Sequence, residues 1–171
     1  MKMVFLSLGS NIGDRLKNLS LAASLIERDI GNIIVCSSVY ETEPWGFQSE
    51  EQFLNQVLKV KTTDQLSEVL KKINALEVFM GRVRKTETYT SRVIDIDILF
   101  CDDLIVNMKS LVIPHPRLHL RNFTLVPLIE IAGEFIHPVF RENLIALATK
   151  CTDMKKVRIY SKPPCSKFDA R

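Results

Sequence analysis

The chain has 171 residues, of which 46% are hydrophobic and 25% charged, with 23 Lys and Arg against 20 Asp and Glu. This composition is typical of one globular domain and excludes collagen-like, low-complexity and disulfide-dense chains. The longest apolar run, Leu144 to Ala148, is far too short to cross a bilayer, and the N-terminus lacks a signal-peptide pattern, so we expect a cytoplasmic protein without membrane contact.

The first 31 residues predict a strand followed by a helix. Lys2 to Leu8 is a short apolar segment that favours a strand. Apolar residues then recur at helical spacing from Leu16 to Ile30, and Gly31 would end this helix. Asn11 or Asp14 could supply the N-terminal cap.

The same alternation of strand and helix continues to residue 101. Three further strands are expected over residues 32–40, 52–61 and 93–101. A helical stripe from Leu66 to Leu76 predicts a second long helix before the last of these strands. The order is that of an α+β, ferredoxin-like βαββαβ core, with an antiparallel sheet, both helices on one face and a ligand on the open face. Short helices near residues 125–132 and 142–150 would form a C-terminal extension.

The end of the chain differs in charge from the rest. Residues 152–171 carry six Lys and Arg against two Asp and Glu, and include two adjacent prolines. We therefore expect a single domain over residues 1–151 and a basic, solvated tail over 152–171. The near-neutral body argues against nucleic-acid binding. No C-x-x-C pair occurs, so Cys36, Cys101, Cys151 and Cys165 are expected to be reduced thiols.

The predicted strand over residues 93–101 carries two acids. Alternation places Asp95 and Asp97 on one face, about 7 Å apart along the strand. The opposite face would carry Ile94, Ile96, Ile98 and Phe100. Two carboxylates at this spacing could hold Mg²⁺, which prefers oxygen ligands and accompanies substrate phosphates. The alternative is the solvated polar face of an edge strand.

Basic residues lie next to these acids in the sequence. Arg82 and Arg84 precede them in a polar segment, and Arg92 comes directly before the strand. One arginine can donate two parallel hydrogen bonds to phosphate oxygens. Together with metal ions, arginines could therefore hold a transferring phosphoryl group in place. His115, held between two prolines, could bond a phosphate, and Arg121 would add charge. A solvated basic loop and a structural histidine are the alternatives.

The strand over residues 52–61 could bind a flat heterocycle. Phe53, Asn55 and Val57 share one face, which offers a ring for stacking and an amide for the ligand's edge, although Phe53 could equally be core. Trp45 would be a lid residue or a loop anchor. P-loop, G-x-G-x-x-G and G-x-S-x-G motifs are absent. From these residues alone we infer a Mg²⁺-dependent phosphoryl or nucleotidyl transferase.

Seven segments together are more specific than any of them alone. They are Ser7–Asp14, Tyr40–Gly46, Phe53–Asn55, Gly81–Arg84, Ser91–Leu99, Ile113–Arg117 and Arg121–Leu128. In this order they resemble the 6-hydroxymethyl-7,8-dihydropterin pyrophosphokinase family of folate biosynthesis. The resemblance implies transfer of diphosphate from ATP to the hydroxymethyl group of the pterin, with release of AMP.

The resemblance also implies roles for individual residues. Asp95 and Asp97 would bind two Mg²⁺ ions, with Arg82 and Arg92 as the other catalytic residues. The nucleotide-binding residues would be Arg84, Tyr89, Ile98, His115 and Arg121. The pterin-binding residues would be Thr42, Trp45, Phe53, Asn55 and Phe123, with the two phenylalanines on either side of the ring. The partners would be pterin and ATP, with no nucleic acid and no membrane, and we expect a monomer.

Three positions depart from the family pattern, and two other functions stay open. Ser110 stands where members with arginine use it for the nucleotide, Thr90 stands where Gly or Ala is usual, and Tyr89 stands where some members have Trp. One alternative is a metal-dependent nucleotidyl transferase of the polymerase-palm type, which would release pyrophosphate. The other is a binding module of the same fold that does not turn over substrate.

Overall fold

The computed structural model describes residues 1–46, 51–82 and 91–162. Among these residues, no helix has the length and apolar character that crossing a membrane requires. The main sheet is antiparallel, in the order β5-β1-β4-β3-β8, with β2 also pairing β4. Its strands are β1 (Lys2–Ser10), β2 (Asn32–Cys36), β3 (Val39–Thr42), β4 (Phe53–Thr62), β5 (Asp95–Cys101) and β8 (Val157–Ser161).

The predicted βαββαβ order is confirmed, with one strand divided in two. Helix α1 (Arg15–Asp29) follows β1, and α2 (Leu66–Phe79) lies between β4 and β5. Asp14 caps α1 by accepting a hydrogen bond from the backbone of Lys17. The strand expected over residues 32–40 is divided into β2 and β3 at the buried Ser37. There the backbone N–H of Val57 in β4 donates to the hydroxyl oxygen of Ser37 instead of to a backbone carbonyl group.

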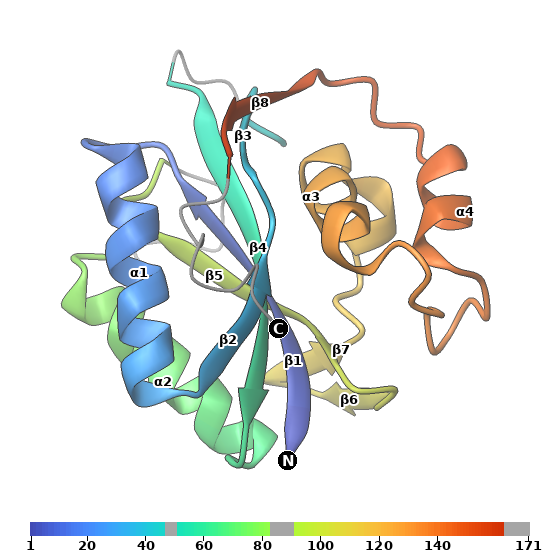
Figure 1. Ribbon diagram of the computed structural model, residues 1–171, viewed down its shortest axis with the longest axis horizontal. Coiled ribbons are helices and arrows are strands. Elements are labelled where there is room, and N and C mark those ends of the chain that lie inside the picture. The colour runs from blue at the N-terminus through green and yellow to red at the C-terminus, as the bar shows by residue number, and fades with distance from the viewer. Residues whose placement is uncertain (47–50, 83–90, 163–171) are drawn as a thin grey trace.

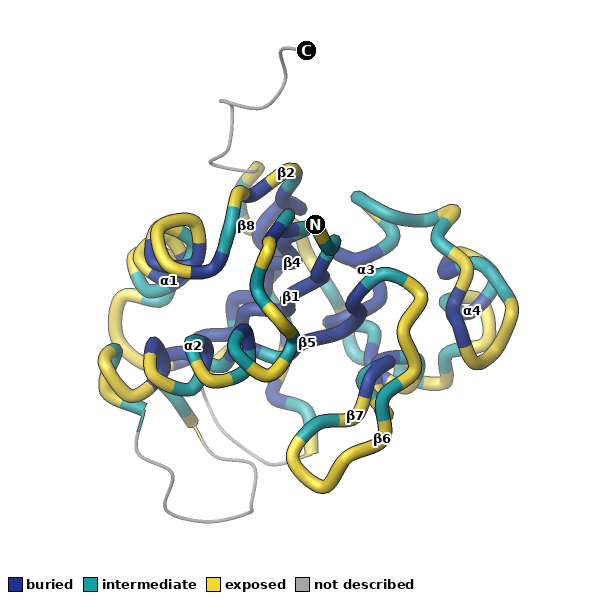
Figure 2. Tube along the Cα trace, turned by 90° about the horizontal axis from the view of Figure 1, so that it is seen from below, coloured by how far each residue is buried: buried dark blue, intermediate teal, exposed yellow. Residues whose placement is uncertain are grey.

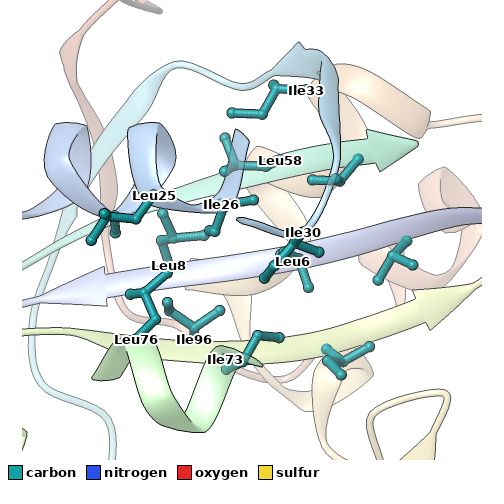
Figure 3. Packing of buried hydrophobic residues seen from close by; sticks show 14 of the residues in the cluster. Leu6, Leu8, Leu25, Ile26, Ile30, Ile33, Leu58, Ile73, Leu76 and Ile96 are labelled. Carbon is teal, nitrogen blue, oxygen red and sulfur yellow. The ribbon is translucent and has the colours of Figure 1, made fainter. Parts of the chain in front are cut away.

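Both long helices cover the same face of the sheet, as predicted (Figure 1). Leu6 and Leu8 of β1 pack with Ile26 of α1 and Ile73 of α2 in the larger hydrophobic core (Figure 3). Gly31 follows α1 where the chain passes close to β4. A Cβ atom at Gly31 would lie 2.3 Å from the carbonyl oxygen of Lys61.

The opposite face is not open along its whole length, which corrects the sequence interpretation. Helices α3 (Asn122–Ala132) and α4 (Leu144–Thr149) cover one part of it through a second core (Figure 1). Phe100 belongs to this second core, not to the face of Ile96 and Ile98. The reason is a β-bulge: the register with β1 shifts at Leu99, and one extra residue reverses the alternation of side chains.

Four elements were not predicted from the sequence. Strands β6 (Val106–Met108) and β7 (Leu111–Ile113) form a hairpin with an exposed turn, and a short 3₁₀ helix covers Leu118–Leu120 (Figure 2). The fourth is β8, which pairs antiparallel with β3. The basic tail is therefore not a solvated extension over Val157–Ser161, because backbone pairing at a sheet edge does not depend on apolar composition.

The cysteines only partly follow expectation. Cys101 and Cys151 are free thiols, as predicted. Cys36 is disulfide-bonded, which corrects the prediction for that residue. Wide spacing in the sequence does not prevent a disulfide, because only the distance between the two backbones in the fold limits it.

Candidate active site

A row of three residues crosses three neighbouring strands of the sheet, β4, β1 and β5. Gly9 of β1 pairs with Asn55 of β4 on one side and with Asp95 of β5 on the other. A Cβ atom at Gly9 would lie 3.3 Å from the side-chain oxygen of Asn55. A glycine therefore leaves the surface hollow between the amide and the carboxylate. Two residues along, Ser7 pairs with Asp97 in the same way.

This hollow is a cavity of about 190 Å³ on the part of the sheet face that α3 and α4 leave uncovered. It brings together eleven of the predicted site residues. These are Thr42, Trp45, Phe53, Asn55, Arg82, Arg92, Asp95, Asp97, His115, Arg121 and Phe123. Arg84 and Tyr89 lie outside the described residues, and Ile98 lines a different cavity described below.

The two aspartates share the predicted face but have different partners. Asp95 forms ion pairs of 2.6 Å with both Arg82 and Arg92, one through each carboxylate oxygen. Asp97 faces His115 instead, with 3.9 Å between its carboxylate oxygen and Nε2. Burial raises the pKa of both carboxyl groups, and for Asp95 the neighbouring charge of Asp97 raises it further. A cation placed between the two would favour their charged forms.

His115 is a neutral hydrogen-bond donor at this site. Burial, with the nearby charge of Arg121, lowers its pKa to about 4. Its Nδ1 accepts a hydrogen bond from the backbone of Arg117, so the remaining proton is on Nε2, the atom that faces Asp97. The backbone N–H of His115 donates to the carbonyl group of Leu99 at 2.9 Å, which fixes the loop to β5.

Glu77 is a buried residue of α2 that the sequence interpretation missed. Its carboxylate pairs with Arg82 and accepts a 2.8 Å hydrogen bond from the backbone of Ile96, the residue between the two aspartates. It therefore holds both an arginine and the β5 backbone in place. The available signal was its position four residues after Ile73, on the apolar face of the predicted helix.

Asn11 is a second positioning residue that the sequence interpretation missed. The sequence suggested it as a possible helix cap, but Asp14 fills that place. The Asn11 side chain instead accepts a 2.7 Å hydrogen bond from the backbone of Arg92 and donates a 2.9 Å bond to the hydroxyl group of Ser91. Arg92 is thus fixed at its backbone by Asn11 and at its guanidinium by Asp95.

The other end of the cavity is aromatic and amide-lined. Asn55 donates a 2.7 Å hydrogen bond from its side chain to Thr42, and both residues are buried. The guanidinium of Arg121 lies 4.5 Å from the centre of the Trp45 ring and 5.6 Å from that of Phe123. Stacked rings beside a fixed amide are suited to a flat heterocycle.

A second, larger cavity of about 630 Å³ adjoins the first. The two share Arg82, Asp97 and His115. The second cavity extends between α2 and the β6–β7 hairpin. Its further lining includes Leu70, Asn74, Ile98, Lys109, Ser110 and Leu111. Of these, only Ile98 was predicted as a site residue. The arrangement can hold two ligands end to end, with Arg82, Asp97 and His115 at their junction.

A family model described as 7,8-dihydro-6-hydroxymethylpterin-pyrophosphokinase matches residues 5–133. The chain belongs to this pyrophosphokinase family. Membership confirms the predicted transfer of a pyrophosphoryl group to hydroxymethyldihydropterin in folate biosynthesis.

Relatives within the pyrophosphokinase family resemble most of the chain. The 2-amino-4-hydroxy-6-hydroxymethyldihydropteridine pyrophosphokinase of Aquifex aeolicus is 42% identical over 84% of this chain and 89% of its own length. The protein of the same name from Porphyromonas gingivalis is 39% identical over 81% of this chain and 95% of its own. The folic acid synthesis protein of Pneumocystis carinii is 35% identical over 88% of this chain, which spans only 20% of that longer protein.

Solved structures confirm the fold of this family for the chain. An HPPK-DHPS in complex with substrates superposes with a TM-score of 0.71 at 16% identity, over 87% of this chain and 43% of that one. A Plasmodium falciparum HPPK-DHPS triple mutant gives a TM-score of 0.70 at 21% identity, over 87% of this chain and 44% of that one. The chain thus spans less than half the length of these two structures.

Proposed function

We propose that the two adjoining cavities hold the pterin and ATP, and that diphosphate passes between them where they meet. The hydroxymethyl oxygen of the pterin attacks the β-phosphorus of ATP. The bond from that phosphorus to the oxygen bridging the α-phosphate breaks, and AMP leaves. The observation that carries this proposal is the shared lining of the cavities by Arg82, Asp97 and His115.

The pterin is assigned to the smaller cavity by its shape and polarity. Its ring would lie between Phe53 and Phe123, with its polar edge against Asn55 and Thr42. Trp45 and Arg121 line the same cavity and are stacked on each other. When the ring enters, Arg121 would be drawn toward the phosphates of ATP, because its charge is then better neutralised there.

Asp95 and Asp97 suit Mg²⁺, and we propose them as ligands of two ions. They offer carboxylate oxygens, the ligand type that Mg²⁺ prefers. Groups of three or more His, Cys, Asp or Glu that could hold a metal by themselves are absent from the described part of the chain, so phosphate oxygens and water would complete each coordination shell. When bound, the ions would neutralise charge on the attacking and leaving oxygens.

The cationic side chains would stabilise the charge that develops on the transferring group. Their ion pairs with Asp95 would give way to metal and phosphates, while Glu77 would keep Arg82, and Asn11 the backbone of Arg92, at the site. His115 would donate from Nε2 to a phosphate oxygen. In the larger cavity Ile98 would contact the nucleotide, while Lys109, next to Ser110, supplies a cation near the position where some members have arginine. Arg84 and Tyr89 stay predictions as further nucleotide contacts.

Product analysis tests this function directly. The protein is mixed with ATP, Mg²⁺ and 6-hydroxymethyl-7,8-dihydropterin, and AMP, ADP and pyrophosphate are separated. We expect pterin-dependent AMP that disappears when the metal is chelated. ADP would indicate a simple kinase and pyrophosphate a nucleotidyl transferase. Bound pterin without any product would indicate a binding module.

We also propose that the enzyme acts as a monomer in the cytoplasm. Sedimentation of the active protein at the mass of one chain, 19.5 kDa, is the expected result. Activity found only in a dimeric fraction would contradict the proposal.

A further inference from the structure

The segment from Asp153 to Ser161 contacts the start of helix α3. The carboxylate of Asp153 accepts a 3.0 Å hydrogen bond from the backbone N–H of Asn122, the first residue of that helix. The Asn122 side chain donates in return to the backbone carbonyl of Asp153. A carboxylate at a helix N-terminus satisfies a free backbone donor and is favoured by the helix dipole. Asn122 lies between Arg121 and Phe123, both of which line the smaller cavity.

The same segment also contacts the opposite wall of that cavity. The ammonium group of Lys155 donates to the backbone carbonyl of Pro44, the residue before Trp45. Two residues later the segment becomes β8, and Val157 pairs with Thr42 of β3. The segment therefore lies beside the backbone of Thr42 and contacts the residue before Trp45. Asp153 connects the two contacts, because its carboxylate also accepts a 3.1 Å hydrogen bond from the backbone of Lys155.

The segment itself would not touch a substrate bound in either cavity. Residues 153–161 are absent from the described lining of both cavities. The segment also lies outside the match to the family model, which ends at residue 133. Its influence on the site must therefore act through the residues that it holds.

We propose that residues 153–161, the C-terminal strap, are a positioning element that sets the distance between the two walls of the pterin cavity. One wall carries Thr42 and Trp45, and the other carries Arg121 and Phe123. The strap is the described segment that bonds the backbone of both walls. The part of this proposal that concerns the pterin rests on the proposed function.

The far end of α3 is held independently, which makes the strap testable in a folded protein. Glu130 accepts hydrogen bonds from the backbone and hydroxyl group of Ser38 and from the hydroxyl group of Tyr40, all between 2.8 and 2.9 Å. Loss of the strap contacts would therefore free only the first turn of α3 and the Pro44 loop, while the second core stays packed.

The first experiment measures the Trp45 wall without any substrate. Trp45 is the only tryptophan of the chain, so its fluorescence reports on this loop alone. Lys155→Met, which removes the donor, is expected to increase quenching of Trp45 by acrylamide about twofold as the loop opens locally. Lys155→Arg, which keeps a donor, and Lys156→Met, at the exposed neighbouring lysine, should match the unmodified protein. Equal quenching in Lys155→Met and Lys156→Met would overturn the proposal.

The second experiment separates pterin binding from general stability. In Asp153→Ala, loss of the charged cap should raise KM for the pterin about three- to tenfold. KM for ATP should rise clearly less than KM for the pterin, since of the residues that the strap holds only Arg121 is proposed to reach the phosphates, and kcat should change less than about twofold. An equal rise in both KM values, or a lower thermal midpoint with unchanged KM, would show that the strap merely stabilises the fold. If the unmodified protein forms no AMP, the proposed function fails, while the Trp45 quenching still decides on the strap.

Discussion

Asp95 and Asp97 are two residues apart on one strand, yet they call for different experiments. Asp95 is paired with Arg82 and Arg92, so its removal would leave two cations without that partner. Removing Asp95 would therefore do more than relieve repulsion between the two carboxylates. Asp97 faces the neutral His115, and its substitution tests the metal site more directly.

For Asp97→Asn we expect the rate of AMP formation to fall about 100-fold or more, because charge stabilisation at the transferring group is lost. The free energy of unfolding at pH 7 should stay the same or rise, because burial raises the pKa of the Asp97 carboxyl and so disfavours its charged form in the fold. Product analysis and urea denaturation measure the two effects. A near-normal rate in Mg²⁺ would contradict the metal assignment.

His137, away from the catalytic residues, makes stability depend on pH. Its Nδ1 accepts 3.2 Å hydrogen bonds from the backbones of Val139 and Phe140, and burial lowers its pKa to about 4. The histidine pKa in the unfolded chain is about 6.5. Between about pH 4 and about pH 6.5, the unfolded chain therefore binds a proton at this residue and the folded chain does not. Stability contributed by neutral His137 is therefore present above about pH 6.5 and is lost as the pH falls toward 4.

The matched variant His137→Asn keeps a hydrogen-bond acceptor and removes this titration. From pH 7 to pH 5 the unmodified protein should lose about 2 kcal/mol more unfolding free energy than the variant. Urea denaturation at both pH values gives the difference, and the contribution of His115 cancels because both proteins contain it. Parallel losses in the two proteins would show that His137 is protonated in the fold.

At the scale of elements, the passage from α1 to β2 depends on one close approach. A Cβ atom at Gly31 would meet the backbone of Lys61 at 2.3 Å, and backbone cannot move aside as a flexible side chain can. Gly31→Ala should therefore lower the free energy of unfolding by about 3 kcal/mol.

Gly13→Ala is the control for this substitution. Gly13 has a φ of +69° but nothing within 4 Å of its added Cβ, so only the left-handed backbone is penalised, by about 1 kcal/mol. Chemical denaturation of both variants compares the two costs. A Gly31→Ala protein as stable as Gly13→Ala would mean that the helix shifts to make room.

Sequence patterns predicted some of these elements and not others. Spacing of apolar residues predicted α1, α2 and the face shared by Asp95 and Asp97, because these depend on local periodicity. It could not predict the bulge at Leu99 or the pairing of β8, which depend on partners distant in sequence. Residue patterns nominated most of the residues that line the smaller cavity, and the motif resemblance added Thr42 and Phe123. Glu77 was missed because its partners are contacts made only in the fold.

For the whole molecule, ligand binding should be visible as stability. A nonhydrolysable ATP analogue binds only the folded chain, so at 100 times its dissociation constant it adds about 2.7 kcal/mol. For a chain of this size the thermal midpoint should then rise by about 5 to 10 °C. We expect this shift with Mg²⁺ and a much smaller one with chelator. A shift that is equal with and without the metal would contradict metal-assisted nucleotide binding.

The row of Asn55, Gly9 and Asp95 has a consequence for how the molecule acquires activity during folding. These residues come from three strands. The contact between β1 and β5 closes the long loop from Gly9 to Asp95. Contacts of such long range form slowly, because the entropy of loop closure is lost before they stabilise the chain. Partly folded or nascent chains that lack β5 also lack one side of the row. If Asp95 acts as proposed, phosphate chemistry would begin only once β5 has joined the sheet, and incomplete chains would not consume ATP.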